Sequence, residues 1–179
     1  MQNFEIVLQS DRLLLRKITY ADFNDLSRML TDPTVMYAWE HTFSERQIKD
    51  WIERQLEYYR YDGVGYFAAI SKESGDFVGQ MGLHWSDMKG TCILEVCYML
   101  KKEYWHKGFA SEGSKALISY AFGEMHVDKV YACIRTNNFA SLRVAENVEM
   151  KYESSFIKHY NGRDMEHLLY SKVRDDWDA

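Results

Sequence analysis

The segment from Leu94 to Ser111 combines a carboxylate with residues that could bind an anion. A run of β-forming residues ends at Leu100, and after it come Lys101-Lys102-Glu103-Tyr104-Trp105-His106-Lys107-Gly108-Phe109-Ala110-Ser111 and a predicted helix. The first N–H groups of a helix have no helical partners and carry partial positive charge, so they favour a phosphate or another anion. Gly108 allows the backbone to approach that anion closely. The alternative is an ordinary helix start with solvated lysines.

Glu95 lies within the preceding strand, where its neighbours on both faces are apolar. Such a strand is typically central and buried, and a carboxylate there is costly unless it is paired, protonated or open to a pocket. A glutamate beside an anion-binding turn is therefore a candidate general base. A half-exposed position or a structural salt bridge would explain the same residue without chemistry.

A third polar segment, Thr136-Asn137-Asn138-Phe139-Ala140-Ser141, lies between the next predicted strand and a short helix. An N-cap at Asn137 or Asn138 would account for it. If that strand runs parallel to the strand that carries Glu95, the segment falls at the same sheet edge as the Gly108 turn. Ligands of α/β sheets bind at such an edge.

The elements that must position these groups follow from periodicity and turn residues. Strands are predicted at 13–18, 66–71, 78–85, 91–100, 129–134, 150–159 and 165–173, and helices at about 44–60, 108–125 and 140–147. A further helix is predicted between a cap at Thr19 or Asp22 and the Asp32-Pro33 pair that ends it. Ser44 with Gln47 is a capping-box signal. The pattern predicts a mixed α/β protein, and because no linker or repeat interrupts the chain, residues 1–179 are expected to form one domain.

Composition excludes several classes of protein. Apolar residues make up 46% and charged residues 27%, as in globular proteins, and the net charge of −5 argues against a dedicated nucleic-acid partner. The three cysteines have no metal-ligand spacing, so no metal site is expected, and they fit a reducing cytoplasm. No apolar run reaches the roughly 18 residues of a membrane span, and the start of the chain lacks a signal-peptide pattern. A monomer and a homo-oligomer both remain open.

Taken in order, these features resemble the GCN5-related N-acetyltransferase (GNAT) superfamily. Its acetyl-CoA motif, Q/R-x-x-G-x-G/A, is similar to the segment Trp105-His106-Lys107-Gly108-Phe109-Ala110, with Trp105 at the Q/R position. Within the superfamily, the chain most resembles the RimJ/RimL type, the branch of ribosomal-protein N-terminal acetyltransferases. The further matching segments are Ser10-Asp11-Arg12-Leu13, Asp32-Pro33-Thr34-Val35-Met36, Asn138-Phe139-Ala140-Ser141 and Gly162-Arg163-Asp164.

The resemblance implies a GNAT fold, a mixed twisted sheet of about seven strands flanked by about four helices and splayed at its central strands. Acetyl-CoA is the implied cosubstrate. Its pantetheine arm would lie along Tyr98, Met99 and Leu100, and Asn138 would meet the pantetheine or acetyl end. Its pyrophosphate would bind backbone amides of the turn, at His106, Lys107, Gly108, Phe109, Ala110 and Ser111.

The implied reaction is direct transfer of acetyl to a primary amine, a protein N-terminus or a small molecule. Glu95 would accept the amine proton, and Ser141 would protonate the leaving thiolate. In this fold the acceptor wall would be offered by Trp39, His41, Trp51, Tyr58, Tyr59, His159 and Tyr160. Two other interpretations stay open. The chain could be a non-catalytic acyl-CoA-binding or regulatory module on the same fold, or a nucleotide-phosphate binding protein, although it contains neither of the two standard glycine motifs of such proteins.

Overall fold

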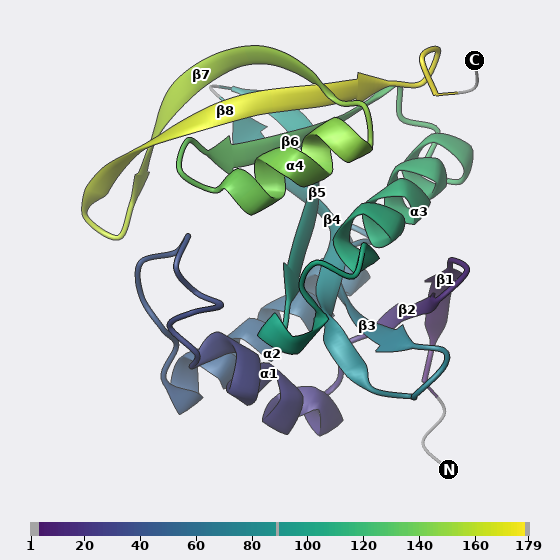
Figure 1. The fold of residues 1–179 in the computed structure, drawn as a ribbon, viewed down its shortest axis with the longest axis vertical. Coiled ribbons are helices and arrows are strands. Elements are labelled where there is room, and N and C mark those ends of the chain that lie inside the picture. Colours follow the sequence, from purple (N-terminus) through teal and green to yellow (C-terminus); the bar gives the residue numbers. More distant parts are fainter. Residues whose placement is uncertain (1–3, 89, 178–179) are drawn as a thin grey trace.

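The computed structural model describes residues 4–88 and 90–177, and within them the chain forms a mixed α/β fold (Figure 1). The elements in order are β1 (Ile6–Gln9), β2 (Leu13–Lys17), α1 (Phe23–Leu30), α2 (Glu45–Tyr61), β3 (Tyr66–Ser71), β4 (Phe77–Met88), β5 (Thr91–Leu100), α3 (Phe109–Gly123), β6 (Lys129–Arg135), α4 (Phe139–Asn147), β7 (Lys151–Tyr160) and β8 (Arg163–Val173). Short 3₁₀ turns cover Tyr20–Asp22 and Lys102–Tyr104. The predicted fold class and the four helices are confirmed.

The described strands form one eight-stranded sheet in the order β1-β2-β3-β4-β5-β6-β8-β7. About seven strands were expected, and the additional one is β1. This strand has four residues, lies at the sheet edge and pairs with β2 through an irregular register between Ile6 and Leu8. Its side chains are exposed or half-buried, so the sequence around it shows no strong alternation of apolar and polar residues.

The sheet is divided between β5 and β6, as the resemblance implied. These strands are parallel, as predicted, but they pair only where Glu95 lies opposite Tyr131. By contrast, β5 pairs with β4 over its whole length, from Thr91 to Leu100. The part of β5 that follows Glu95 therefore has no strand partner on its β6 side.

The four helices cover both faces of the sheet, and their ends follow local sequence signals. Ser44 and Gln47 form the predicted capping box at the start of α2. Helices α1 and α2 pack together, and α3 packs on β4 and β5 and contacts α4. Figure 1 shows α3 and α4 beside one another in front of the sheet, with α1 and α2 at its lower end.

Two apolar cores lie on opposite faces of the sheet. Leu94 and Val96 of β5 belong to the core that includes Leu117 of α3, whereas Met99 belongs to the core that includes Ile48 and Ile52 of α2. Successive side chains of a strand point to opposite faces. Glu95 and Cys97 therefore share the α2 side with Met99, and Tyr98 shares the α3 side with Val96.

Candidate active site

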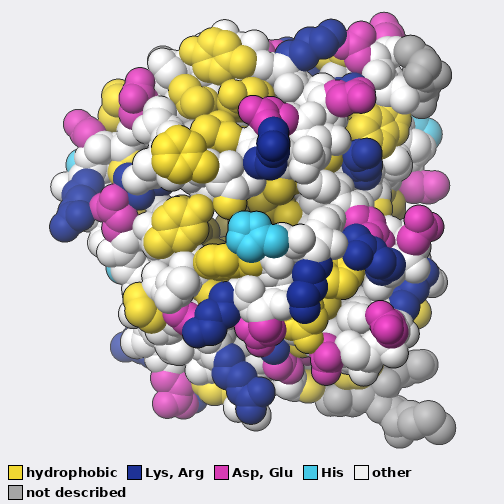
Figure 2. Space-filling model, in the orientation of Figure 1, with side chains coloured by type: hydrophobic (Ala, Val, Ile, Leu, Met, Phe, Trp, Pro, Cys, Tyr) yellow, Lys and Arg dark blue, Asp and Glu magenta, His cyan; other side chains and the backbone are white. Residues whose placement is uncertain are grey.

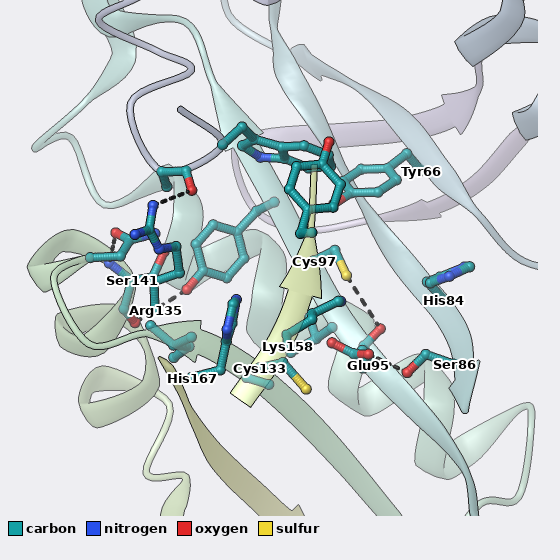
Figure 3. A pocket seen from close by; sticks show the side chains of 18 of the residues that line it. Tyr66, His84, Ser86, Glu95, Cys97, Cys133, Arg135, Ser141, Lys158 and His167 are labelled. Carbon is teal, nitrogen blue, oxygen red and sulfur yellow. Dashed lines mark hydrogen bonds between the residues drawn. The ribbon is translucent and has the colours of Figure 1, made fainter. Parts of the chain in front are cut away.

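A cavity of about 590 Å³ passes through the sheet at the division between β5 and β6. Its lining includes Tyr98, Asn138 and Ser141 from the α3 and α4 side, and Glu95 and Cys97 from the α2 side. Residues that point to opposite faces of a sheet share one cavity only where the strands part. The structure thus brings together both predicted catalytic residues and two of the predicted cofactor-binding residues (Figure 3).

The Gly108 turn lies at the other end of β5 and leads directly into α3. His106 (φ 58°) and Gly108 (φ 82°) have left-handed backbones, and Gly108 is the N-cap of a 15-residue helix with no side-chain cap. The first N–H groups of α3 are thus left without a capping side chain. This is the geometry that the sequence predicted for an anion site.

Arg12 adds a cation to this turn that sequence reasoning did not single out. Its Nη1 donates to the carbonyl oxygen of Lys107 at 3.0 Å, and its Nε lies 2.6 Å from a carboxylate oxygen of Glu112 in the first turn of α3. Ser10 and the backbone N–H of Arg12 donate to the other oxygen of Glu112. The matched segment Ser10-Asp11-Arg12-Leu13 therefore ties β2 to the start of α3.

Trp105 holds the end of β5 against the turn. The indole Nε1 donates to the carbonyl oxygen of Leu100 at 2.9 Å, and the ring is half-buried against both cores. This bond occupies a backbone oxygen of the strand end. Of the predicted cofactor-binding residues, those from Trp105 to Ser111 lie in the turn and at the start of α3, outside the lining of the cavity.

Asn138 is the N-cap of α4, and its side-chain oxygen has two donors. It accepts the N–H of Ser141 at 3.1 Å and the hydroxyl of Tyr37 at 2.6 Å. The hydroxyl of Tyr98 donates to the carbonyl oxygen of Ser141 at 3.2 Å, which links β5 to α4 across the division of the sheet. Burial raises the pKa of Tyr98 well above its ordinary value, so this hydroxyl stays protonated at neutral pH.

Glu95 is 8% exposed and lies on the floor of the cavity. The hydroxyl of Ser86 donates to one of its oxygens, and its partner across the ladder is His84 of β4. Among residues 4–88 and 90–177, no cationic side chain lies within 4.0 Å of this carboxylate. The structural salt bridge that was the alternative for Glu95 is therefore not formed within the part of the chain that is described.

Two cysteines and two histidines surround Glu95 on the same side of the sheet (Figure 3). Burial, reinforced by the negative charge of Glu95, raises the pKa of Cys97 to about 12 and raises the pKa of Cys133 as well. Burial lowers the pKa of His84 and of His167. At neutral pH both thiols are therefore protonated and both imidazoles are neutral.

Aromatic residues form much of the wall of this cavity. Five of the seven expected acceptor-wall residues line it: Trp39, His41, Trp51, Tyr58 and Tyr160. Tyr59 does not, because its ring is buried on Phe67 and its hydroxyl donates to the carbonyl oxygen of Tyr66. His159 does not either, since it is exposed and pairs with Asp164.

Several residues of the cavity escaped sequence reasoning. Ser86, Cys133 and Lys158 belong to three different strands that the chain brings together only on folding. Cys97 carried a usable signal, because it lies two residues from Glu95 on the same strand and must share its face. Tyr98 was assigned to the cofactor through its backbone, and its hydroxyl bond to α4 was not foreseen.

Two further structural findings concern metals and membranes. Within residues 4–88 and 90–177, no group of three or more His, Cys, Asp or Glu side chains is arranged to hold a metal ion. The helices of that same part include none that is long and apolar enough to cross a membrane.

Comparison with known proteins agrees with the geometry of the site. Residues 12–151 match the sequence model of the family described as "Acetyltransferase (GNAT) domain". An uncharacterized protein of Bacillus subtilis (strain 168), YkkB, is 31% identical over 157 residues, which cover 87% of this chain and 91% of YkkB.

Two solved structures extend the comparison to the fold. A GNAT-family acetyltransferase from Bacillus anthracis superposes with a TM-score of 0.80 at 24% identity, over 97% of this chain and 99% of that one. RimL, described as a ribosomal L7/L12 alpha-N-protein acetyltransferase, was solved in complex with coenzyme A; it superposes with a TM-score of 0.76 at 15% identity, over 96% and 99% of the two chains. The family match covers the strands β5 and β6 at which the sheet divides, the Gly108 turn and α4, and the chain belongs to the GNAT family of acetyltransferases.

Proposed function

We propose that this protein transfers the acetyl group of acetyl-CoA to a primary amine, and that the two substrates meet in the division between β5 and β6. One observation carries the proposal: a single cavity reaches Ser141 and Glu95, which lie on opposite sides of the sheet. An acyl donor that enters from the α3 and α4 side and an amine that enters from the α2 side would meet there.

The groups that line the division fit an extended pantetheine arm. Beyond Glu95, the backbone of β5 from Tyr98 to Leu100 has no partner on β6. The amide groups that this segment turns away from β4 are therefore available to the amides of pantetheine, apart from the carbonyl oxygen of Leu100, which accepts from Trp105. The uncapped start of α3, from His106 to Ser111, would hold the pyrophosphate, and Arg12, which pairs with Glu112, places its guanidinium beside it. Bound acetyl-CoA supplies the reactive thioester.

The transfer asks for one proton acceptor and one proton donor. The amine nitrogen attacks the thioester carbonyl carbon, a C–N bond forms and the C–S bond breaks. Glu95 accepts the amine proton, directly or through a water molecule, and Ser141 donates a proton to the departing sulfur. Backbone N–H groups near Val96 and Tyr98 polarise the carbonyl oxygen. The products are an N-acetyl amide and the free thiol, so the proton taken from the amine balances the one given to sulfur.

The energetics favour an α-amine over a lysine side chain. Deprotonation at pH 7 costs about 1.4 kcal/mol for an amine of pKa about 8, and about 4.6 kcal/mol for one near 10.4. A protein N-terminus or a small α-amine therefore needs less help from Glu95. The name of the structural neighbour RimL refers to an α-amine of a ribosomal protein, which supports the N-terminus as one candidate acceptor.

Thioester turnover with a panel of primary amines tests this function. We expect release of free CoA thiol that depends on the amine, together with a product 42 Da heavier by mass spectrometry (the mass gained on acetylation). A non-catalytic module would bind CoA with no amine-dependent release, and that outcome would contradict the proposal. Stronger competition by ATP than by CoA for the same site would instead favour a nucleotide-binding protein.

The setting of the reaction is also part of the proposal. Cys92, Cys97 and Cys133 are all free, and Cys92 is exposed. Exposed free thiols persist in a reducing compartment, which supports action in the cytoplasm.

A further inference from the structure

Two cations line the acceptor side of the cavity without an acidic partner. Arg54 lies on α2 and Lys158 on β7, so two separate elements contribute them to the lining. Among the described residues, neither has a carboxylate within 4.0 Å. Arg135 also lines the cavity, but its guanidinium already has partners, because it pairs with Glu40 at 2.8 Å and donates to the carbonyl oxygen of Ala38.

Both charges act on His84, which lies beside Glu95 on the floor of the cavity. Burial is the main cause of the lowered pKa of His84; Glu95 opposes this effect, and the charges of Lys158 and Arg54 add to it. The pKa of the buried Cys97 thiol responds to the same two residues, because Glu95 raises it and Lys158 lowers it. Figure 3 shows Lys158 reaching in toward the part of the floor that holds Glu95. Both cations thus lie within electrostatic reach of the place where an amine would be deprotonated.

The charges of the acceptor side do not suit an acceptor that carries only an amine. Glu95 and Asp50 are the acidic residues that line the cavity, and an incoming amine brings a positive charge that Glu95 complements. The positive charges of Arg54 and Lys158 then have no negative group on the ligand to balance them, and they repel the cationic amine. Both cations are exposed in the free protein, and their repulsion with a cationic ligand grows as the bound acceptor displaces the solvent that screens it. An anionic group on the acceptor would remove that cost.

We propose that the acceptor carries a carboxylate close to its reactive amine, and that Lys158 of β7 and Arg54 of α2 bind this carboxylate. The inference rests on the proposed acetyl transfer and names its substrate class. Ammonium and guanidinium groups form charge-assisted hydrogen bonds with carboxylates, which are about twice as strong as neutral ones. The carboxylate has two sources with the same chemistry: the α-carboxylate of a free amino acid, or an acidic side chain next to a peptide N-terminus.

Matched acceptor pairs separate these sources. One arm compares L-leucine with L-leucinamide, and the other compares peptides that differ only by glutamate, glutamine or lysine at the second position. The kcat/KM values are expressed per unprotonated amine, because the amide lowers the amine pKa. In one of the two arms we expect the acidic member to be favoured roughly tenfold or more, mostly through KM.

Charge reversal in the enzyme supplies the second half of the test. Lys158→Glu should abolish the preference for the acidic acceptor or turn it into a preference for the peptide with lysine. Lys151→Glu is the matched control, because it lies on the same strand, outside the cavity, where it pairs with Asp176. This control should keep the wild-type preference. Calorimetry with the N-acetylated products gives the same ranking without turnover.

The outcomes distinguish this inference from the function on which it rests. Good turnover of uncharged amines with equal rates for both members of each pair would overturn the inference and leave acetyl transfer standing. No turnover of any amine, together with equal affinity for charged and neutral products, would overturn both. Intact-mass measurement adds a further check, since acetylation of Lys158 itself by acetyl-CoA would make it an acceptor and contradict its role in binding.

Discussion

Replacing Gly108 by alanine should weaken CoA binding far more than it weakens the fold. Gly108 has φ of 82°, and an added Cβ would lie 3.3 Å from Nη2 of Arg12. The methyl group therefore strains the backbone and also crowds the guanidinium that sits beside the predicted phosphate site. A left-handed backbone costs a residue other than glycine roughly 1–2 kcal/mol, and about 1 kcal/mol lowers the Tm of a chain this size by about 2–4 °C.

Gly75→Ala is the matched control for the strain. Gly75 has φ of 76°, lies between β3 and β4, and an added Cβ there would meet nothing within 4 Å. Both variants should therefore lose similar stability. Only Gly108→Ala should lose hydrogen bonds to a phosphate, and bonds to a charged group contribute about 1.5–3 kcal/mol each, or roughly 10- to 150-fold in Kd.

Calorimetric titration with CoA and thermal unfolding of both variants measure the two effects separately. We expect equal Tm values and a Kd that rises only for Gly108→Ala. Equal CoA affinity for the two variants would show that the turn before α3 does not hold the pyrophosphate.

Three other predictions concern the proton transfers and the support of the turn. Glu95→Gln should lower kcat/KM at pH 7 by roughly 10²–10⁴-fold, and the loss should shrink above the amine pKa of about 8. A pH–rate profile parallel to that of wild type would contradict the role of Glu95 as the general base. Ser141→Ala should lower kcat by roughly 10- to 100-fold with CoA affinity unchanged, whereas an unchanged kcat in steady-state assays would leave Ser141 as part of the helix start. Burial alone would raise the pKa of Glu112, but hydrogen bonds from Ser10 and Arg12 bring it below its ordinary value of 4.5. Its stabilising effect is therefore present above pH 4.5 and is lost as the pH falls through the lowered folded-state pKa. Glu112→Gln should accordingly lower the Tm at pH 7 by about 2–4 °C and match wild type in strong acid, and a difference that is constant with pH in thermal scans would refute the role of its charge.

Local sequence signals predicted the elements of this protein well. The capping box at Ser44 and Gln47 and the turn at Gly108 each act within a few residues, so the spacing of residue types is enough to place them. The family motifs are equally local, which is why the resemblance could be stated before the fold. The strand β1 was missed because it is short, lies at an edge and is little buried.

The composition of the cavity depended on long-range packing. Glu95 was identified as a buried carboxylate from its own strand, but its hydrogen-bond partner Ser86 lies on β4 and the cation Lys158 lies on β7. Tyr59 shows the same limit, because the family resemblance placed it in the acceptor wall, while packing buries its ring in the core. Periodicity tells which face of an element a residue occupies. Which strands part, and which side chains then meet in the opening, depends on how the whole sheet twists and packs.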